Sequence, residues 1–155
     1  MAIIDYAQRK YDFLGLQVAK LDREARVSLA LYSEDNAGKI CAGVQKLAQR
    51  WTLEFLTELG SMPGLPARGS TFMLQVRRGE LRTQLDVTQS FYDAALRIRA
   101  TLQAEEYDGM PDDERLDDVE LMSVAIEPGY LNLRVMINSV AGTGRAVVLP
   151  IDTLP

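Results

Sequence analysis

Side chains able to do chemistry are scarce in this chain of 155 residues, which has no histidine and a single cysteine, Cys41. The lack of histidine excludes most zinc sites and the Ser-His and Cys-His nucleophile arrangements, and one cysteine cannot form an internal disulfide. Cys41 lies in the apolar segment KICAGV, which favours a small buried side chain over a reactive thiol. The serines show neither a Ser-x-x-Lys spacing nor a Gly-x-Ser-x-Gly elbow. Carboxylates and tyrosines remain as candidates for catalysis.

Three glutamates, Glu54, Glu58 and Glu80, flank a Pro/Gly-rich segment and invite a test for glycosidase chemistry. A glycosidase needs two carboxylates held across a cleft, one as the acid and one as the nucleophile or base. Glu54 and Glu58 are four residues apart, so they share one helical face and are equally well explained as its polar side. The sequence Gly142-Thr143-Gly144 is a turn and not a phosphate cradle, because no helical pattern follows it. We predict no catalytic residue, no metal site and no cofactor.

The acidic segment before the C-terminal third contains the tripeptide Asp113-Glu114-Arg115. An arginine presented on a loop beside a sheet suits bidentate pairing with a partner's carboxylate or with backbone carbonyls. The alternative is that the residues around it form a solvated acidic loop, which Arg115 only neutralises. Both interpretations remain open at this point.

Length and composition favour one domain over residues 1–155, with a core of ordinary size. The net charge of -5 argues against nucleic acid as a partner, because phosphate binding needs a clustered basic face. No apolar run approaches the length needed to cross a bilayer, and the first ten residues lack the order of a signal peptide. We therefore expect no membrane contact and folding in a cytosol.

The first half of the sequence predicts a β-rich lead-in at residues 1–37, followed by a helix. A turn cluster at 34–38 predicts a hairpin between residues 29–33 and 39–42. Apolar residues then recur at steps of three and four, which predicts a helix with one buried face ending just before Gly60. The members of that face are Val44, Leu47, Ala48, Trp51, Phe55 and Leu59.

The second half predicts one or two helical turns at 71–78, a long helix capped by Thr83 or Asp86, and three strands. The strands are expected at 116–126, 130–140 and 146–151, joined by the turns 127–129 and 141–144 into an antiparallel meander. The fold class is therefore α+β, with small antiparallel sheets and two long helices. The last strand is short and contains Pro150, which predicts an edge that stays unpaired until a partner strand arrives.

The segment from Gly43 to Ser70 resembles the lysozyme-like baseplate wedge subunits, or sheath initiators, of contractile phage tails, which also occur in type VI secretion baseplates. In that family a glycine leads into a helix with Leu-x-Gln-Arg and Leu-Thr, then a glycine and a Pro-x-x-Gly-Ser turn. The matching residues here are Gly43, Leu47, Gln49, Arg50, Leu56, Thr57, Gly60, Pro66, Gly69 and Ser70. The acid-Pro-Arg tripeptide of the family corresponds to residues 113–115, with Glu114 in place of the proline.

The resemblance implies a structural role in the virion and no enzymatic activity. Family members commonly carry Gly-Glu after the first helix, whereas this chain has Gly60-Ser61. The expected partners are other wedge proteins, the tail sheath protein and the tail tube or hub proteins, around which six copies form a ring. The expected contacts are Asp113, Glu114 and Arg115 for docking, and Arg145, Val147 and Leu149 for an added sheath strand. The alternatives are a cell-wall glycosidase and a subunit of a type VI secretion baseplate.

Overall fold

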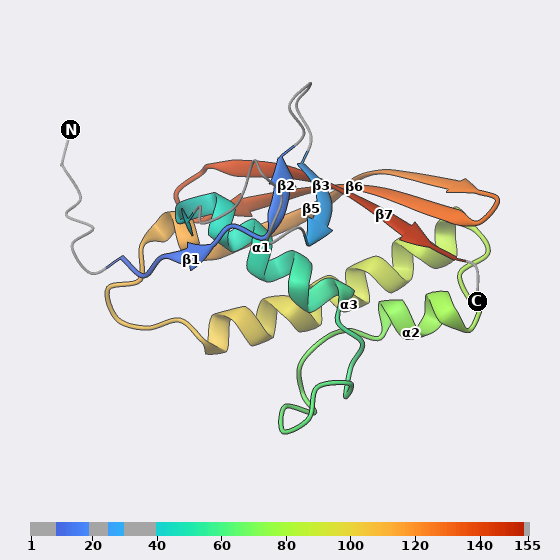
Figure 1. Ribbon diagram of the computed structural model, residues 1–155, viewed down its shortest axis with the longest axis horizontal. Helices are drawn as coiled ribbons and strands as arrows, with labels where there is room; N and C mark the ends of the chain where they lie inside the picture. Colours follow the sequence, from blue (N-terminus) through green and yellow to red (C-terminus); the bar gives the residue numbers. More distant parts are fainter. Residues whose placement is uncertain (1–8, 19–24, 30–39, 154–155) are drawn as a thin grey trace.

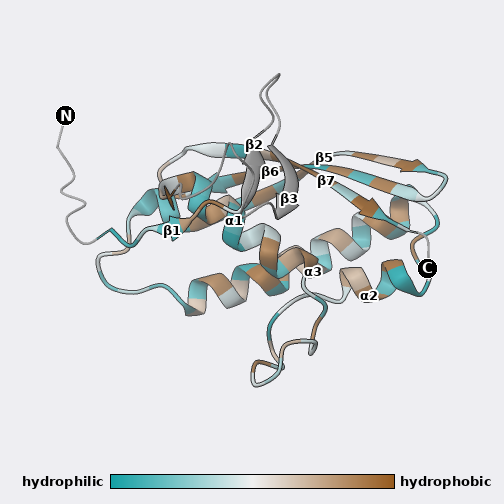
Figure 2. Ribbon diagram, in the orientation of Figure 1, coloured by the Kyte–Doolittle hydropathy of each residue, from teal (hydrophilic) through white to brown (hydrophobic). Residues whose placement is uncertain are grey.

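A computed structural model describes residues 9–18, 25–29 and 40–153, and places three α-helices against a twisted sheet (Figure 1). The helices are α1 (Gly43–Leu56), α2 (Phe72–Arg77) and α3 (Gln84–Ala104), and a short 3-10 turn, η1 (Asp112–Glu114), precedes the C-terminal strands. Brown and teal segments alternate along α1 and α3, as expected of helices with one apolar face (Figure 2).

The main sheet has five strands in the order β2-β3-β7-β6-β5. Three of them form the predicted antiparallel meander: β5 (Leu116–Glu127), β6 (Tyr130–Ser139) and β7 (Gly144–Asp152). The others are β2 (Leu16–Val18) and β3 (Ala25–Leu29), which pair antiparallel with each other. A separate pair joins β1 (Asp12–Phe13) to β4 (Ile40–Cys41). The α+β class and the C-terminal meander are confirmed.

One predicted strand pairing was wrong, and another falls largely on residues that the structure does not describe. Strand β4 pairs with β1. The predicted hairpin partner at 30–33 and the predicted turn at 34–38 lie outside the described residues. Strand β7 is not an unpaired edge, because β3 pairs with it in parallel, Ala25 opposite Val147 and Arg26 opposite Val148. The parallel partner comes from the start of the chain. No local pattern in the sequence indicates a pairing over that distance.

The helix ends follow local hydrogen bonding. Thr83 caps α3: its hydroxyl accepts from the Asp86 amide at 3.1 Å, and the Asp86 carboxylate accepts from the Thr83 amide at 2.8 Å. Hydrogen bonds to its carboxylate from the Thr83 hydroxyl and from the Thr83 amide also hold the pKa of Asp86 below its usual value. Helix α1 ends at Leu56, three residues before the predicted end, because the Leu59 amide donates instead to the Ser70 carbonyl across the connecting loop.

Strand β5 departs twice from simple alternation, and each departure is a bulge. Its pairing with β6 skips one residue between Leu116 and Asp118 and another between Leu121 and Ser123. The extra residue at each bulge resets the alternation, so that the apolar residues stay on the face toward the helices. Those residues are Leu116, Val119, Leu121, Val124 and Ile126.

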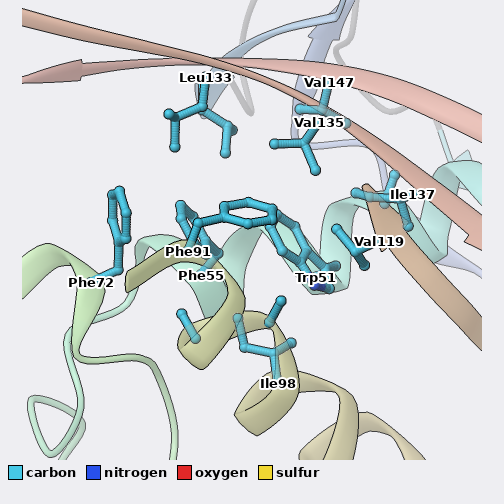
Figure 3. Packing of buried hydrophobic residues seen from close by; sticks show 14 of the residues in the cluster. Trp51, Phe55, Phe72, Phe91, Ile98, Val119, Leu133, Val135, Ile137 and Val147 are labelled. Atoms are coloured by element: carbon cyan, nitrogen blue, oxygen red, sulfur yellow. The ribbon is translucent and has the colours of Figure 1, made fainter. Parts of the chain in front are cut away.

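The core lies between the helices and the sheet, with Trp51 of α1 near its centre (Figure 3). The Trp51 ring stacks on Phe55 at a centroid distance of 4.9 Å and lies 5.9 Å from Phe91 of α3. From the sheet, Leu133 and Val135 point into the same space (Figure 3). One aromatic cluster therefore connects two helices to the middle of the meander.

Candidate interaction site

The tripeptide Asp113-Glu114-Arg115 spans the end of η1 and the entry to β5, and its side chains have different surroundings. Glu114 points inward and is 1% exposed. One carboxylate oxygen accepts from the Lys46 ammonium at 2.8 Å. The other accepts from the Gly43 amide at 3.1 Å and lies 3.4 Å from the Arg9 guanidinium. Glu114 is therefore fully paired within the chain.

Glu114 also serves as a remote cap for α1. The residue at the N-cap position, Ala42, has no side chain that could accept a hydrogen bond. The carboxylate of Glu114 takes that place at the first helical residue, Gly43, where the helix dipole favours an anion. A proline at position 114 could supply neither this carboxylate nor the amide that donates to the Pro111 carbonyl at 2.9 Å.

The same cluster ties the N-terminal segment to the helices. Asp113 accepts two hydrogen bonds from Arg9, at 3.0 and 3.1 Å, and Lys46 donates to the Lys10 carbonyl. Further along α1, Gln49 accepts from the Gly15 amide at 2.7 Å and donates to the Phe13 carbonyl at 2.7 Å. Asp113 and Glu114 thus anchor Arg9, while Lys46 and Gln49 hold the residues that follow it up to Gly15. The internal role of the two acidic residues was not evident from their sequence positions.

Arg115 has the opposite placement. Its side chain is 40% exposed and pairs with Glu106 at 3.0 Å and with Asp112 at 3.2 Å, both near the surface. Of the three tripeptide side chains, Arg115 is the most exposed, against 23% for Asp113 and 1% for Glu114. The two acidic neighbours orient the guanidinium without burying it, so it remains accessible to a carboxylate of another protein.

The three candidates on β7 divide between core and surface. Val147 and Leu149 are buried among the apolar residues that face the helices, so their side chains do not reach a partner. Arg145 is half-buried at the start of the strand, opposite Ile137 of β6. The prediction that this strand offers a free edge fails because β3 occupies its outer side at Val147 and Val148.

The long edge of the main sheet is β5. Strands β2 and β5 end the strand order, and β2 has three residues whereas β5 has twelve. A long edge strand presents a row of backbone donors and acceptors for another chain. Sequence patterning assigned β5 correctly as a strand, but its position in the sheet depends on the β3 and β7 pairing described above.

Two of the three carboxylates considered for glycosidase chemistry are engaged in structural contacts. Glu54 is buried, pairs with Arg68 at 2.6 Å and accepts from the Gly69 amide at 2.9 Å. Glu58 pairs with Arg77, and Glu80 is exposed on the surface. These contacts fix the ends of the loop between α1 and α2, which projects from the rest of the molecule (Figure 1).

Gly69 at the base of that loop has a backbone that only glycine fits easily. Its φ is +92°, and a Cβ there would lie 2.5 Å from the Thr57 carbonyl oxygen. The next residue, Ser70, is buried and donates through its hydroxyl to the Phe55 carbonyl at 2.8 Å. Among the described residues, no group of three or more histidine, cysteine, aspartate or glutamate side chains could hold a metal ion. None of the helices in those ranges combines the length and the hydrophobicity that a membrane span requires.

The chain was compared with protein families, curated proteins and solved structures, and no similar protein was found. No family model matches the chain, and no curated protein or solved structure matches it significantly.

Proposed function

We propose that the protein is a structural subunit of the baseplate of a contractile phage tail, which docks onto wedge proteins around the tube and starts the sheath by β-strand addition. The observation that carries this proposal is the twelve-residue edge strand β5. Natural proteins blunt such edges or use them for pairing, and strand addition gives affinity through main-chain hydrogen bonds. The added sheath strand is therefore assigned to β5 and not to β7.

The pairing of the buried carboxylates is also consistent with a structural role in binding other proteins. The buried carboxylates Glu54 and Glu114 are both neutralised by cations of the same chain. The resemblance of residues 43–70 and 113–115 to wedge subunits supplies the identity of the partners. A ring of six copies, with wedge, sheath and tube or hub proteins as neighbours, is part of this proposal.

Met122→Pro is expected to stop sheath initiation while leaving the subunit folded. Met122 lies at the second β5 bulge, has no partner residue on β6 and is 45% exposed. Proline is tolerated at bulges and edges, but its missing amide and its ring obstruct a strand added outside. Electron micrographs of particles assembled with this variant should show baseplates with naked tubes.

Met122→Ala is the matched control, because it removes the side chain and keeps the backbone amide. Particles with this variant should carry normal sheaths. Normal sheaths with Met122→Pro, in a subunit shown to be incorporated, would contradict the assignment of β5 as the initiating edge.

Arg115→Ala is expected to weaken docking to wedge proteins with little loss of stability. The side chain is exposed, and ion pairs at the surface, such as its two with Glu106 and Asp112, contribute little to stability. Loss of an arginine that becomes buried in an interface costs about 2 kcal/mol or more. Co-purification with wedge proteins and the melting temperature should be measured on the same preparation.

Arg78→Ala is the control for Arg115→Ala, since Arg78 is also exposed and its ion pair with Glu80 is long, at 3.8 Å. We expect wedge proteins to co-purify with it as with the unchanged protein. A large drop in melting temperature for Arg115→Ala with intact co-purification would make Arg115 a structural residue.

A further inference from the structure

A small hollow opens between α3 and the first half of β5. Its volume is about 70 Å³, room for one small apolar side chain, and its floor is formed by Ala95, Leu116 and Val119. Tyr92 and Leu96 form its rim from the helix side and are 43% and 67% exposed. An apolar hollow with exposed apolar walls lies here beside the open edge of the sheet.

The exposed apolar residues continue along α3. Leu85 is 64% exposed and precedes Tyr92 by seven residues, which places it on the same helical face. Helix α3 runs beside β5, since the side-chain amide of Gln84 donates to the Val124 carbonyl at 3.4 Å. The stripe formed by Leu85, Tyr92 and Leu96 is called the α3 stripe below. It provides apolar surface along the length that an added strand would cover.

The edge strand itself is acidic. The sequence of β5 contains Asp117, Asp118, Glu120 and Glu127 and no lysine or arginine. Asp118 lies at the mouth of the hollow, where Arg99 of α3 is the one basic residue of the lining. A second copy of this chain, placed edge to edge on β5, would bring two acidic strands together, which is unfavourable. Charge complementarity favours a basic partner.

We infer that the hollow, the α3 stripe and the β5 edge together bind an extended segment of a different protein, with apolar residues at alternate positions and lysine or arginine between them. The inference rests on the proposed function and names the chemistry of the strand that β5 receives. Side chains of an added strand alternate between two faces. Partner side chains opposite Val119 and Leu121 lie on the helix side of the sheet, where one apolar side chain fills the hollow. Partner side chains opposite Asp118 and Glu120 lie next to carboxylates, which favour lysine or arginine.

The test uses two capped nine-residue peptides, one alternating valine with lysine and one alternating valine with glutamate. Titration of the isotope-labelled protein should give the lysine peptide an affinity at least tenfold higher, with the largest amide shifts in β5 and around Leu96. Its affinity should fall with added salt. Equal affinities, or shifts centred on another surface, would overturn the inference.

Two sets of variants make the result specific. Leu96→Glu should weaken lysine-peptide binding at least tenfold. The control Leu65→Glu, at a leucine that is also exposed but lies in the loop between α1 and α2, should not weaken it. The double variant Asp118→Lys/Glu120→Lys should reverse the peptide preference, whereas Asp108→Lys should preserve it. Equal losses for both leucine variants, or a dimer of this chain that Leu96→Glu dissociates, would overturn the inference.

These outcomes are distinguishable from those that test the proposed function. Charge-selective binding at β5 together with normal sheaths on Met122→Pro particles would leave the inference standing and refute sheath initiation. Naked tubes with Met122→Pro, together with no preference between the peptides, would retain sheath initiation and refute the inference.

Discussion

Glu114→Ala is expected to destabilise the fold by about 3–5 kcal/mol, because it leaves a buried cation without its partner. Lys46 loses its 2.8 Å contact, and the Gly43 amide at the start of α1 loses its acceptor. Arg9 keeps its two bonds to Asp113, so the loss falls mainly on Lys46 and on the helix terminus. Chemical denaturation followed by circular dichroism measures the change in the free energy of unfolding.

Two comparisons separate charge from packing in this experiment. Asp112→Ala removes a neighbouring carboxylate that is exposed, and it should change stability by no more than about 1 kcal/mol. The double variant Lys46→Met/Glu114→Leu replaces the buried pair by apolar groups and should recover most of the loss. A double variant as unstable as Glu114→Ala would show that the helix cap, and not the unpaired ammonium, dominates the effect.

Trp51→Ala is expected to cost about 3–5 kcal/mol, in the range for removing a large aromatic side chain from a packed core. Trp51 is fully buried and contacts Phe55 and Phe91, so its loss leaves a cavity that helix and sheet cannot both close. The transition in urea should move to lower concentration and keep its slope.

Trp51→Phe provides the matched comparison for that cavity. The indole nitrogen of Trp51 is buried and has no hydrogen-bond partner within the part of the chain that the structure describes. Phenylalanine removes this unsatisfied donor and keeps most of the ring, so its cost should be clearly smaller than that of alanine. Equal costs for the two variants would mean that the packing of the indole itself is what the core requires.

Local signals in the sequence predicted the elements well. The capping pair Thr83 and Asp86 defines the start of α3 through bonds between neighbours, and the alternation in residues 130–140 predicts β6. The end of α1 was placed too late, because Leu59 fits the helical spacing but donates its amide to Ser70 across the loop. A competing long-range hydrogen bond leaves no trace in the periodicity.

The candidate site was harder to predict, because burial decides the role of a charged residue. In the sequence, Asp113, Glu114 and Arg115 all belong to an acidic loop with one arginine, and nothing there indicates which side chain is buried. In the structure, Glu114 is enclosed and Arg115 is accessible. The partner of Glu114, Lys46, lies on a distant helix. The free edge was likewise misplaced, since whether β7 or β5 ends the sheet depends on β3, which comes from the start of the chain.

The parallel pairing of β3 with β7 also constrains the order in which the protein folds. Strand β3 is synthesised early, whereas the strand it pairs with is completed close to the C-terminus. The β2–β3 hairpin and the β5–β6–β7 meander can each form from neighbouring residues, but they cannot join until β7 has been synthesised, and their joining closes a long loop. During that interval the outer side of β7 is open, so a nascent chain has two long edges and the finished protein has one. Joining β3 to β7 therefore decides which edge remains for a partner.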